Sequence, residues 1–324
     1  MSGPILGMEA SGGTPVKAVA PLAVISLAAT LILAPPGLPA GATATAPVCS
    51  SSSHPGLAGR ISAGIEAARH DRRSFVAVEV DDPGAGVLCR LDSGTHFDSA
   101  SVVKVTILGT LLHDAEDAHR SLTARERSLA WAMITRSDNG AASALWDEDG
   151  RSRLQRFLDD AGMTETVLGP GAAWGLTRIT AADETRLLWL LLEPNKVLDT
   201  SSRNYALGLM AEVTASQRWG VTAGAPRSLT AHVKNGWLPL APYGWRINSI
   251  GGFTARAGQH SGQRYSIVVL TQDNPTMGYG VDTVERIAEA VNRDLEPGAV
   301  ARVPASGVSP ALQTPDETVP AGAG

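Results

Sequence analysis

A largely apolar stretch at residues 97–112 predicts a buried element. Within residues 100–112 the single charge is Lys104. Such a run is too short to cross a membrane, and its β-branched residues would also allow a strand. We predict a helix, because Asp98 and Ser99 are typical N-cap residues and apolar positions continue to the end of the stretch.

Helical and strand patterns follow one another in a defined order along the rest of the chain. Helical periodicity or capping signals mark residues 55–70, 123–134, 141–146, 153–158, 187–192, 204–213 and 281–295. Strand patterns mark residues 74–80, 87–91, 231–233, 245–250 and 265–271. Thr123 with Glu126 has the pattern of a capping box, and Thr180 with Asp183 predicts a second helix start.

This order predicts an α+β fold. A helix and two strands come first, many helices follow, and three strands and a helix close the series. The two terminal pieces must therefore form one antiparallel sheet around a helical insertion. We expect the functional cleft between this sheet-containing body and the helical subdomain. We place the folded body at residues 53–295. Its sheet subdomain would comprise residues 53–98 and 220–295, and its helical subdomain residues 99–219.

Both ends of the 324-residue chain differ from this body in composition. Lys17 precedes an apolar run at residues 18–34, and small residues after it offer cleavage sites, so residues 1–46 resemble an export signal. An uncleaved membrane anchor is the alternative. Residues 296–324 are rich in Pro, Gly, Ala and Ser and predict a disordered tail. We therefore expect a secreted protein that meets the membrane only through its signal.

The charge balance limits the possible binding partners, and the cysteines predict a disulfide. The net charge is −5 and no basic patch is present, which argues against nucleic acid as a partner. The seven His show no metal-site spacing, and we expect a monomer without metal or cofactor. Cys49 and Cys89 both follow the predicted cleavage site and predict a disulfide, with two free thiols as the alternative. Cys49 lacks a lipobox context.

Three short motifs carry the candidate chemistry. Ser101 and Lys104 lie three residues apart, on one face of the predicted helix. An amine in apolar surroundings loses affinity for its proton and can act as a base toward a hydroxyl. Only four of the 27 basic residues are Lys, so a Lys in this helix suggests proton chemistry. A capping Ser and a Lys that reaches solvent would be the structural alternative.

The second and third motifs are Ser137-Asp138-Asn139, which follows a predicted helix, and Lys234-Asn235-Gly236 on a predicted strand. Taken alone, the second reads as a turn. In this order the three motifs resemble the Ser-x-x-Lys, Ser-Asp-Asn and Lys-Thr-Gly set of class A β-lactamases and penicillin-binding proteins. The resemblance covers about residues 53–295. It implies a three-layer α/β/α body with a helical subdomain.

The resemblance also implies roles for individual residues. Ser101 would be the nucleophile that forms an acyl-enzyme, and Lys104 would hold or relay its proton. Ser137 would pass a proton to the leaving nitrogen. The backbone N–H groups of Ser101 and Trp237 would form the oxyanion hole. The residues implied in substrate binding are Asn139, Lys234, Asn235, Gly236, Trp237 and Arg246.

Two departures from the family pattern affect the expected activity. Residues 163–177 form a short loop without the Glu-x-x-x-Asn that positions the deacylating water in class A β-lactamases. Glu165 is the nearby carboxylate, and we interpret it as a surface residue. Asn235 replaces the usual Thr. Acylation machinery is thus present, whereas fast hydrolysis of the acyl-enzyme is not expected.

Three functions remain open from the sequence. The first is a secreted serine hydrolase that opens β-lactams with slow turnover. The second is a peptidase that acts on D-Ala-D-Ala ends of peptidoglycan. The third is a non-catalytic binding protein on the same fold. An α/β-hydrolase is not supported, because the chain has no Gly-x-Ser-x-Gly motif.

Overall fold

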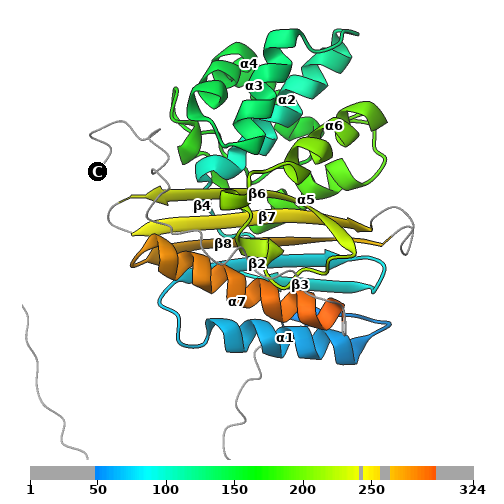
Figure 1. Ribbon diagram of the computed structural model, residues 1–324, viewed down its shortest axis with the longest axis vertical. Coiled ribbons are helices and arrows are strands. Elements are labelled where there is room, and N and C mark those ends of the chain that lie inside the picture. The colour runs from blue at the N-terminus through cyan, green and yellow to red at the C-terminus, as the bar shows by residue number, and fades with distance from the viewer. Residues whose placement is uncertain (1–47, 241–243, 256–262, 297–324) are drawn as a thin grey trace, which may run out of the picture. The chain divides into compact units, whose positions relative to one another are not determined.

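An antiparallel sheet of six strands forms the centre of the part of the chain that the structure describes (Figure 1). This computed structural model describes residues 48–240, 244–255 and 263–296. The predicted export signal and nearly all of the predicted tail lie outside these residues. The strand order is β1-β3-β2-β8-β7-β6. The strands are β1 Cys49–Ser50, β2 Phe75–Asp82, β3 Val87–Leu91, β6 Leu229–Pro239, β7 Trp245–Ala255 and β8 Arg264–Asn274.

The two ends of the described chain meet in this sheet. β2 pairs with β8 over a register that runs from Phe75 opposite Gln272 to Asp81 opposite Ser266. β2 and β3 belong to the first part of the chain and β6 to β8 to the last part, with the inserted helices between them. The predicted α+β fold, in which two terminal pieces form one antiparallel sheet, is therefore confirmed.

Two helices cover one face of the sheet. They are α1, Pro55–Arg69, and α7, Met277–Leu295, which pack against each other below the strands in Figure 1. Ile61, Ile65 and Ile287 are fully buried there. This layer completes the α/β/α body, because branched apolar side chains of both helices fill the space against the sheet.

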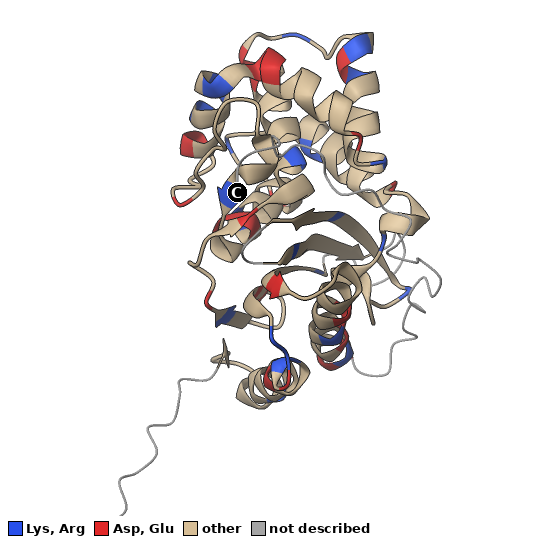
Figure 2. Cartoon of the chain, turned by 90° about the vertical axis from the view of Figure 1, so that its left-hand side faces the viewer, with Lys and Arg blue, Asp and Glu red and all other residues tan. Residues whose placement is uncertain are grey.

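The inserted helices lie on the opposite side of the sheet (Figure 1). α5 packs directly on β2, β7 and β8, α6 packs on β6, and α2, α3 and α4 lie further from the sheet. Their bounds are α2 Lys104–Asp117, α3 Ala124–Thr135, α4 Asn139–Asp160, α5 Ala181–Leu192 and α6 Thr200–Ala211. Charged residues gather on the helices and turns, whereas the central strands carry few of them (Figure 2). The exact subdomain boundaries stay a prediction.

Local capping signals predicted two helix starts correctly. Thr123 Oγ1 accepts from Glu126 N, and the Glu126 side chain accepts from Thr123 N, which completes the capping box of α3. Thr180 Oγ1 likewise accepts from Asp183 N at the start of α5. The two predicted helical pieces at 141–146 and 153–158 both lie within α4, whose helical backbone is interrupted between them at Gly150, with a φ of 70°.

The predicted cap of the helix around Lys104 is wrong. A short 3-10 turn, η1 Ala100–Val103, leads directly into α2, and Ser99 makes no side-chain cap. Ser99 Oγ donates instead to the backbone oxygen of Ala100. The Asp98 carboxylate forms an ion pair with Arg246 of β7. The Asp98 carboxylate therefore pairs with a residue that is distant in sequence instead of capping the helix.

Cys49 of β1 and Cys89 of β3 form a disulfide, as predicted. The two residues stand opposite each other in the sheet, so the covalent bond joins neighbouring strands at its edge. Among the described residues, no helix combines the length and apolar character that a membrane crossing requires.

The buried carboxyl group of Asp149 predicts a pH-dependent stability. Burial, with the nearby Asp114 carboxylate, raises its pKa to about 8. The folded state keeps a proton that the unfolded state releases near pH 4, so the free energy of unfolding must fall as pH rises from about 4 to about 8. Asp149→Asn removes this loss. Its stability at pH 8 should exceed that of the wild type by ~1–3 kcal/mol.

Denaturant unfolding at several pH values measures this difference. The exposed Asp71 is the matched control, and Asp71→Asn should follow the wild-type pH profile. A parallel offset of the Asp149→Asn profile at all pH values would contradict the proposed titration.

Candidate active site

Lys104 connects the residues of two motifs. It lies in the first turn of α2, and its side chain is fully buried. Its Nζ donates to the Ser137 backbone oxygen at 2.8 Å, to Ser137 Oγ at 3.1 Å and to Asn139 Oδ1 at 2.7 Å. Lys104, Ser137 and Asn139 therefore lie in direct contact. A neutral amine could donate its two hydrogens to the backbone and amide oxygens and keep its lone pair for a hydroxyl.

Lys234 brings the third motif to the same hydroxyl. This side chain projects from β6, is fully buried, and donates to Ser137 Oγ at 2.9 Å and to the Asn235 backbone oxygen at 2.8 Å. Ser137 Oγ is thus within hydrogen-bond distance of two amines. If both donate, they occupy its two lone pairs and leave its own hydrogen for a third group.

The connection between α3 and α4 fixes the position of Ser137. Only residues 136–138 separate the two helices, and Asp138 Oδ1 caps α4 by accepting from Ala141 N at 2.7 Å. Ser137 adopts a φ of 57°, which is uncommon for a residue with a side chain. Strained backbone of this kind persists where the surroundings enforce it and is frequent at functional sites.

Ser101 lies in the η1 turn, one residue after a second such position. Ala100 has a φ of 46°, and Ser101 itself is almost fully buried. The turn places Ser101 three residues before Lys104 on continuous helical backbone. The strained residue before it sets the direction in which the helix begins.

β6 passes very close to this turn at Gly236. A Cβ atom added to Gly236 would lie 2.7 Å from Ser99 O and 2.9 Å from Ser101 N. Both are backbone atoms, so no side-chain rotation could relieve the contact. The absence of a side chain at Gly236 therefore brings the strand that carries Lys234 against the turn that carries Ser101.

The short loop after α4 supplies a residue that sequence reasoning missed. The fully buried Trp174 places its ring centroid 4.7 Å from Lys104 Nζ, and its Nε1 donates to Ser143 Oγ. An aromatic ring thus stands beside the amine, as in cation–π pairs. Glu165 of the same loop is exposed, as predicted, and its backbone contacts His96 and Asp183.

Asn248 is a second residue that sequence reasoning missed. Its Nδ2 donates to the backbone oxygens of Asp98 at 2.9 Å and Ser99 at 3.3 Å, and its Oδ1 accepts from Thr271 N. It thereby holds the segment before Ser101 against the sheet. An amide in the middle of a predicted buried strand was the signal that could have revealed it.

The remaining predicted residues lie near the motifs but have structural contacts. Arg246 is 2% exposed and pairs through Nε with Asp98 Oδ2 at 3.0 Å. Asn235 Nδ2 donates to the backbone oxygens of Gln217 and Trp219. Their substrate-binding roles, and the oxyanion role of Trp237, stay predictions.

His232 lies two residues before Lys234 on β6 and is buried. Its ring contacts Leu207 O and Thr254 Oγ1, and burial lowers the pKa of His232. The imidazole is therefore neutral at physiological pH. Lys234 is therefore the residue in this part of β6 that could carry a positive charge at that pH.

Comparison with known proteins adds a family and a fold. A model described as the beta-lactamase enzyme family matches residues 125–295. The protein named "Putative lipoprotein LppW", from Mycobacterium tuberculosis and from Mycobacterium bovis, is 25% identical over 183 residues. That match covers 54% of this chain and 58% of the length of the relative.

Solved structures show the same architecture. A class A beta-lactamase from Bacteroides cellulosilyticus superposes with a TM-score of 0.63 and 17% identity, covering 73% of this chain and 97% of the other. A beta-lactamase from Sphaerobacter thermophilus gives 0.60 and 20%, with coverages of 73% and 98%. PBP-A gives 0.62 and 17%, with coverages of 73% and 95%. At these identities the likeness shows the fold.

The contact at Gly236 predicts a large difference between two glycine substitutions. Gly236→Ala should lower the free energy of unfolding by ~1–3 kcal/mol, because the new methyl group would overlap backbone atoms of the Ser101 turn. Gly208→Ala on α6 is the matched control. No atom lies within 4 Å of its added Cβ, and it should stabilise by ~0.5–1 kcal/mol. Equal effects in chemical denaturation would show that the turn is not held against β6.

Proposed function

The chain belongs to the beta-lactamase enzyme family, and we propose that it is a serine hydrolase that forms an acyl-enzyme through Ser101 with β-lactams. One observation carries this proposal. Two buried amines, Lys104 and Lys234, lie within hydrogen-bond distance of the hydroxyl of Ser137, and Lys104 is one helical turn from Ser101. A purely structural role gives no reason to bury two amines around one hydroxyl, since burying charges is unfavourable.

The proposed acylation moves one proton through this group. Ser101 Oγ attacks the lactam carbonyl carbon and gives its proton to the neutral amine of Lys104. The ring C–N bond breaks, and Ser137 donates its hydroxyl proton to the leaving nitrogen. Lys104 then returns a proton to Ser137 Oγ across the 3.1 Å contact. The product nitrogen thus carries the proton that was on Ser137, Ser137 has regained one from Lys104, and Lys104 is neutral again.

The other predicted residues would stabilise charge during this step. The backbone N–H groups of Ser101 and Trp237 are the proposed donors to the oxyanion. Lys234 supplies positive charge next to Ser137, where a substrate carboxylate could lie. Arg246 would support the site indirectly, because its guanidinium pairs with the Asp98 carboxylate just before the Ser101 turn.

We propose that hydrolysis of the acyl-enzyme is slow, because the loop after α4 places Trp174, and not a carboxylate, against Lys104. Its Trp174 ring occupies one side of the amine, and an indole cannot activate water as a carboxylate would. This observation favours a second candidate function, a D-Ala-D-Ala peptidase that β-lactams inhibit. A non-catalytic binding protein is the third candidate, and the two buried amines argue against it.

We propose that the mature protein acts as a monomer outside the cytoplasm. The Cys49–Cys89 disulfide supports an oxidising compartment. A relative named as a lipoprotein supports an envelope location. Cys49 is engaged in the disulfide, so lipid attachment at this residue is not part of the proposal.

Covalent labelling with a fluorescent penicillin tests the proposal. The purified protein should acquire the label, and Ser101→Ala should lose it completely, because no other residue in the proposal forms the ester. Ser201→Ala, at an exposed position on α6, should label as the wild type does. Absence of label on the folded wild-type protein would support a binding protein instead.

The lifetime of the label separates the two enzymatic functions. Label that disappears within minutes, with turnover of a chromogenic cephalosporin, would identify a β-lactamase. Persistent label, with release of D-Ala from a D-Ala-D-Ala peptide, would identify a peptidase.

Replacement of Lys104 by Arg tests the proposed proton transfer. Lys104→Arg should slow acylation nearly as much as Lys104→Ala, by ~100-fold or more, because a guanidinium does not release its proton. The exposed Lys196 is the matched control, and Lys196→Arg should acylate at the wild-type rate. A Lys104→Arg variant with an unchanged labelling rate would refute the role of the amine as a base.

A further inference from the structure

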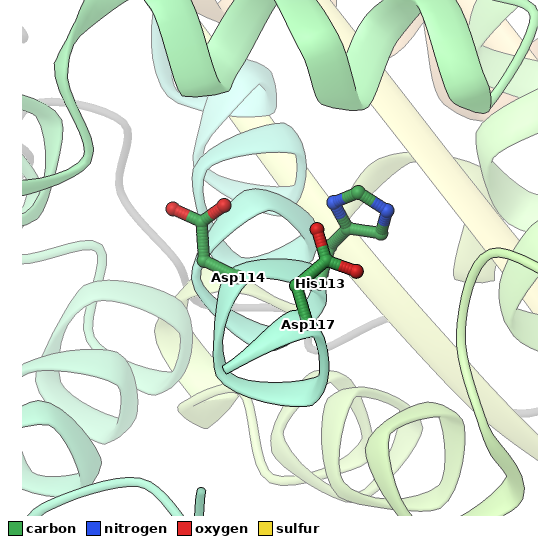
Figure 3. A group of neighbouring side chains, drawn as sticks. All are labelled: His113, Asp114 and Asp117. Atoms are coloured by element: carbon green, nitrogen blue, oxygen red, sulfur yellow. The ribbon is translucent and has the colours of Figure 1, made fainter. Parts of the chain in front are cut away.

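The C-terminal half of α2 carries a group of possible metal ligands, about two turns beyond Lys104. His113, Asp114 and Asp117 each offer an atom, and these atoms lie within 4.8 Å of one another (Figure 3). Positions 113 and 117 are one helical turn apart, as are 114 and 117. This His-Asp-x-x-Asp pattern lacks the paired His or Cys residues by which metal sites are recognised from sequence.

The imidazole of His113 has the environment of a metal ligand. Its side chain is 9% exposed, and its Nε2 lies 3.4 Å from Asp160 Oδ2 of α4. Its Nδ1 is buried and has no hydrogen-bond partner. The Asp160 carboxylate favours the tautomer with hydrogen on Nε2, which leaves the Nδ1 lone pair unused. In metal-binding histidines, one ring nitrogen typically donates to a carboxylate, which orients the ring so that the other nitrogen can bind the metal.

Guanidinium groups now supply the positive charge that the two aspartates require. Arg156 NH2 lies 2.5 Å from Asp114 Oδ1 and 3.2 Å from Asp117 Oδ2, and Arg153 Nε lies 3.1 Å from Asp114 Oδ2. The arginine side chains are about half exposed, whereas Asp114 is buried. The two guanidinium groups could therefore rotate toward solvent, and a smaller cation could bind the aspartates in their place.

We propose that His113 Nδ1, Asp114 and Asp117 bind one divalent transition-metal ion, for which zinc is the best fit. Zinc accepts imidazole and carboxylate ligands together, whereas magnesium and calcium prefer oxygen alone. Tetrahedral bonds of ~2.1 Å place ligand atoms about 3.4 Å apart, so modest side-chain rotations would close the present spacing. Water would complete the coordination.

The ion would have a structural role. His113 contacts Asp160 of α4, so a metal on its other nitrogen would hold α2 against α4. The group lies apart from Ser137, which contacts Lys104 at the opposite end of α2. The inference therefore does not depend on the proposed hydrolase activity.

Calorimetric titration of the full-length protein, without a histidine tag, tests the site with zinc chloride. One equivalent should bind, and Asp117→Asn should weaken it by at least ~10-fold while leaving thermal stability without metal nearly unchanged, because Asp117 is half exposed. Arg156→Gln removes the competing cation and should tighten binding. Cobalt(II) should give the visible absorption of a tetrahedral nitrogen–oxygen site, and magnesium should not compete.

The exposed His70–Asp71 pair serves as the control for zinc binding elsewhere on the surface. Asp71→Asn should leave the zinc titration unchanged. Zinc binding that Asp71→Asn abolishes and Asp117→Asn preserves would overturn the proposal, as would absence of binding to the folded wild-type protein. Penicillin labelling of Ser101 should be equal in Asp117→Asn and wild type, so the two proposals can fail separately.

Discussion

Two buried lysine amines that share one serine hydroxyl are the constraint on which the arrangement of this protein depends. Lys104 comes from α2, Ser137 from the α3–α4 connection and Lys234 from β6, so the contact joins the helical layer to the sheet. Polar groups removed from water must find partners, or the fold loses several kcal/mol. The helical layer therefore cannot move relative to β6 without breaking the hydrogen bond between Lys234 and Ser137.

The backbone around this contact carries conformational strain on both sides. Ala100 and Ser137 each have positive φ values, although neither is glycine. One precedes Ser101, and the other carries the shared hydroxyl. Such conformations cost about 1–3 kcal/mol each and persist only where surrounding contacts fix them. Here Asn248 and Gly236 hold the first position, and the Asp138 cap of α4 holds the second.

The sequence predicted the elements that depend on local interactions. The capping box at Thr123 and the hairpin strands were found because neighbouring residues determine them. The start of α2 was predicted wrongly, because Asp98 pairs with Arg246 across a long stretch of chain. The strands β6 and β7 run further than predicted. On β6 the added residues include Lys234 and Asn235, which are buried through tertiary contacts.

The residues of the candidate site also divide into those that the sequence revealed and those that only the fold brings together. Three motifs revealed the residues whose types are chemically unusual in this chain, above all two of its few lysines. Trp174 could not be found, because its role comes from the folding of a loop over Lys104 rather than from spacing. Its residue type alone suggests only a buried aromatic side chain.

The position of β2 between β3 and β8 has a consequence for how the protein matures. The β2–β3 hairpin is synthesised before the inserted helices, whereas β8, the other neighbour of β2, is synthesised after them. Contacts between such distant segments form slowly, because a long loop must close first. Ser137 and Lys234 are likewise far apart in the nascent chain, so the hydrogen bond between them forms only after β6 has been synthesised and has paired in the sheet.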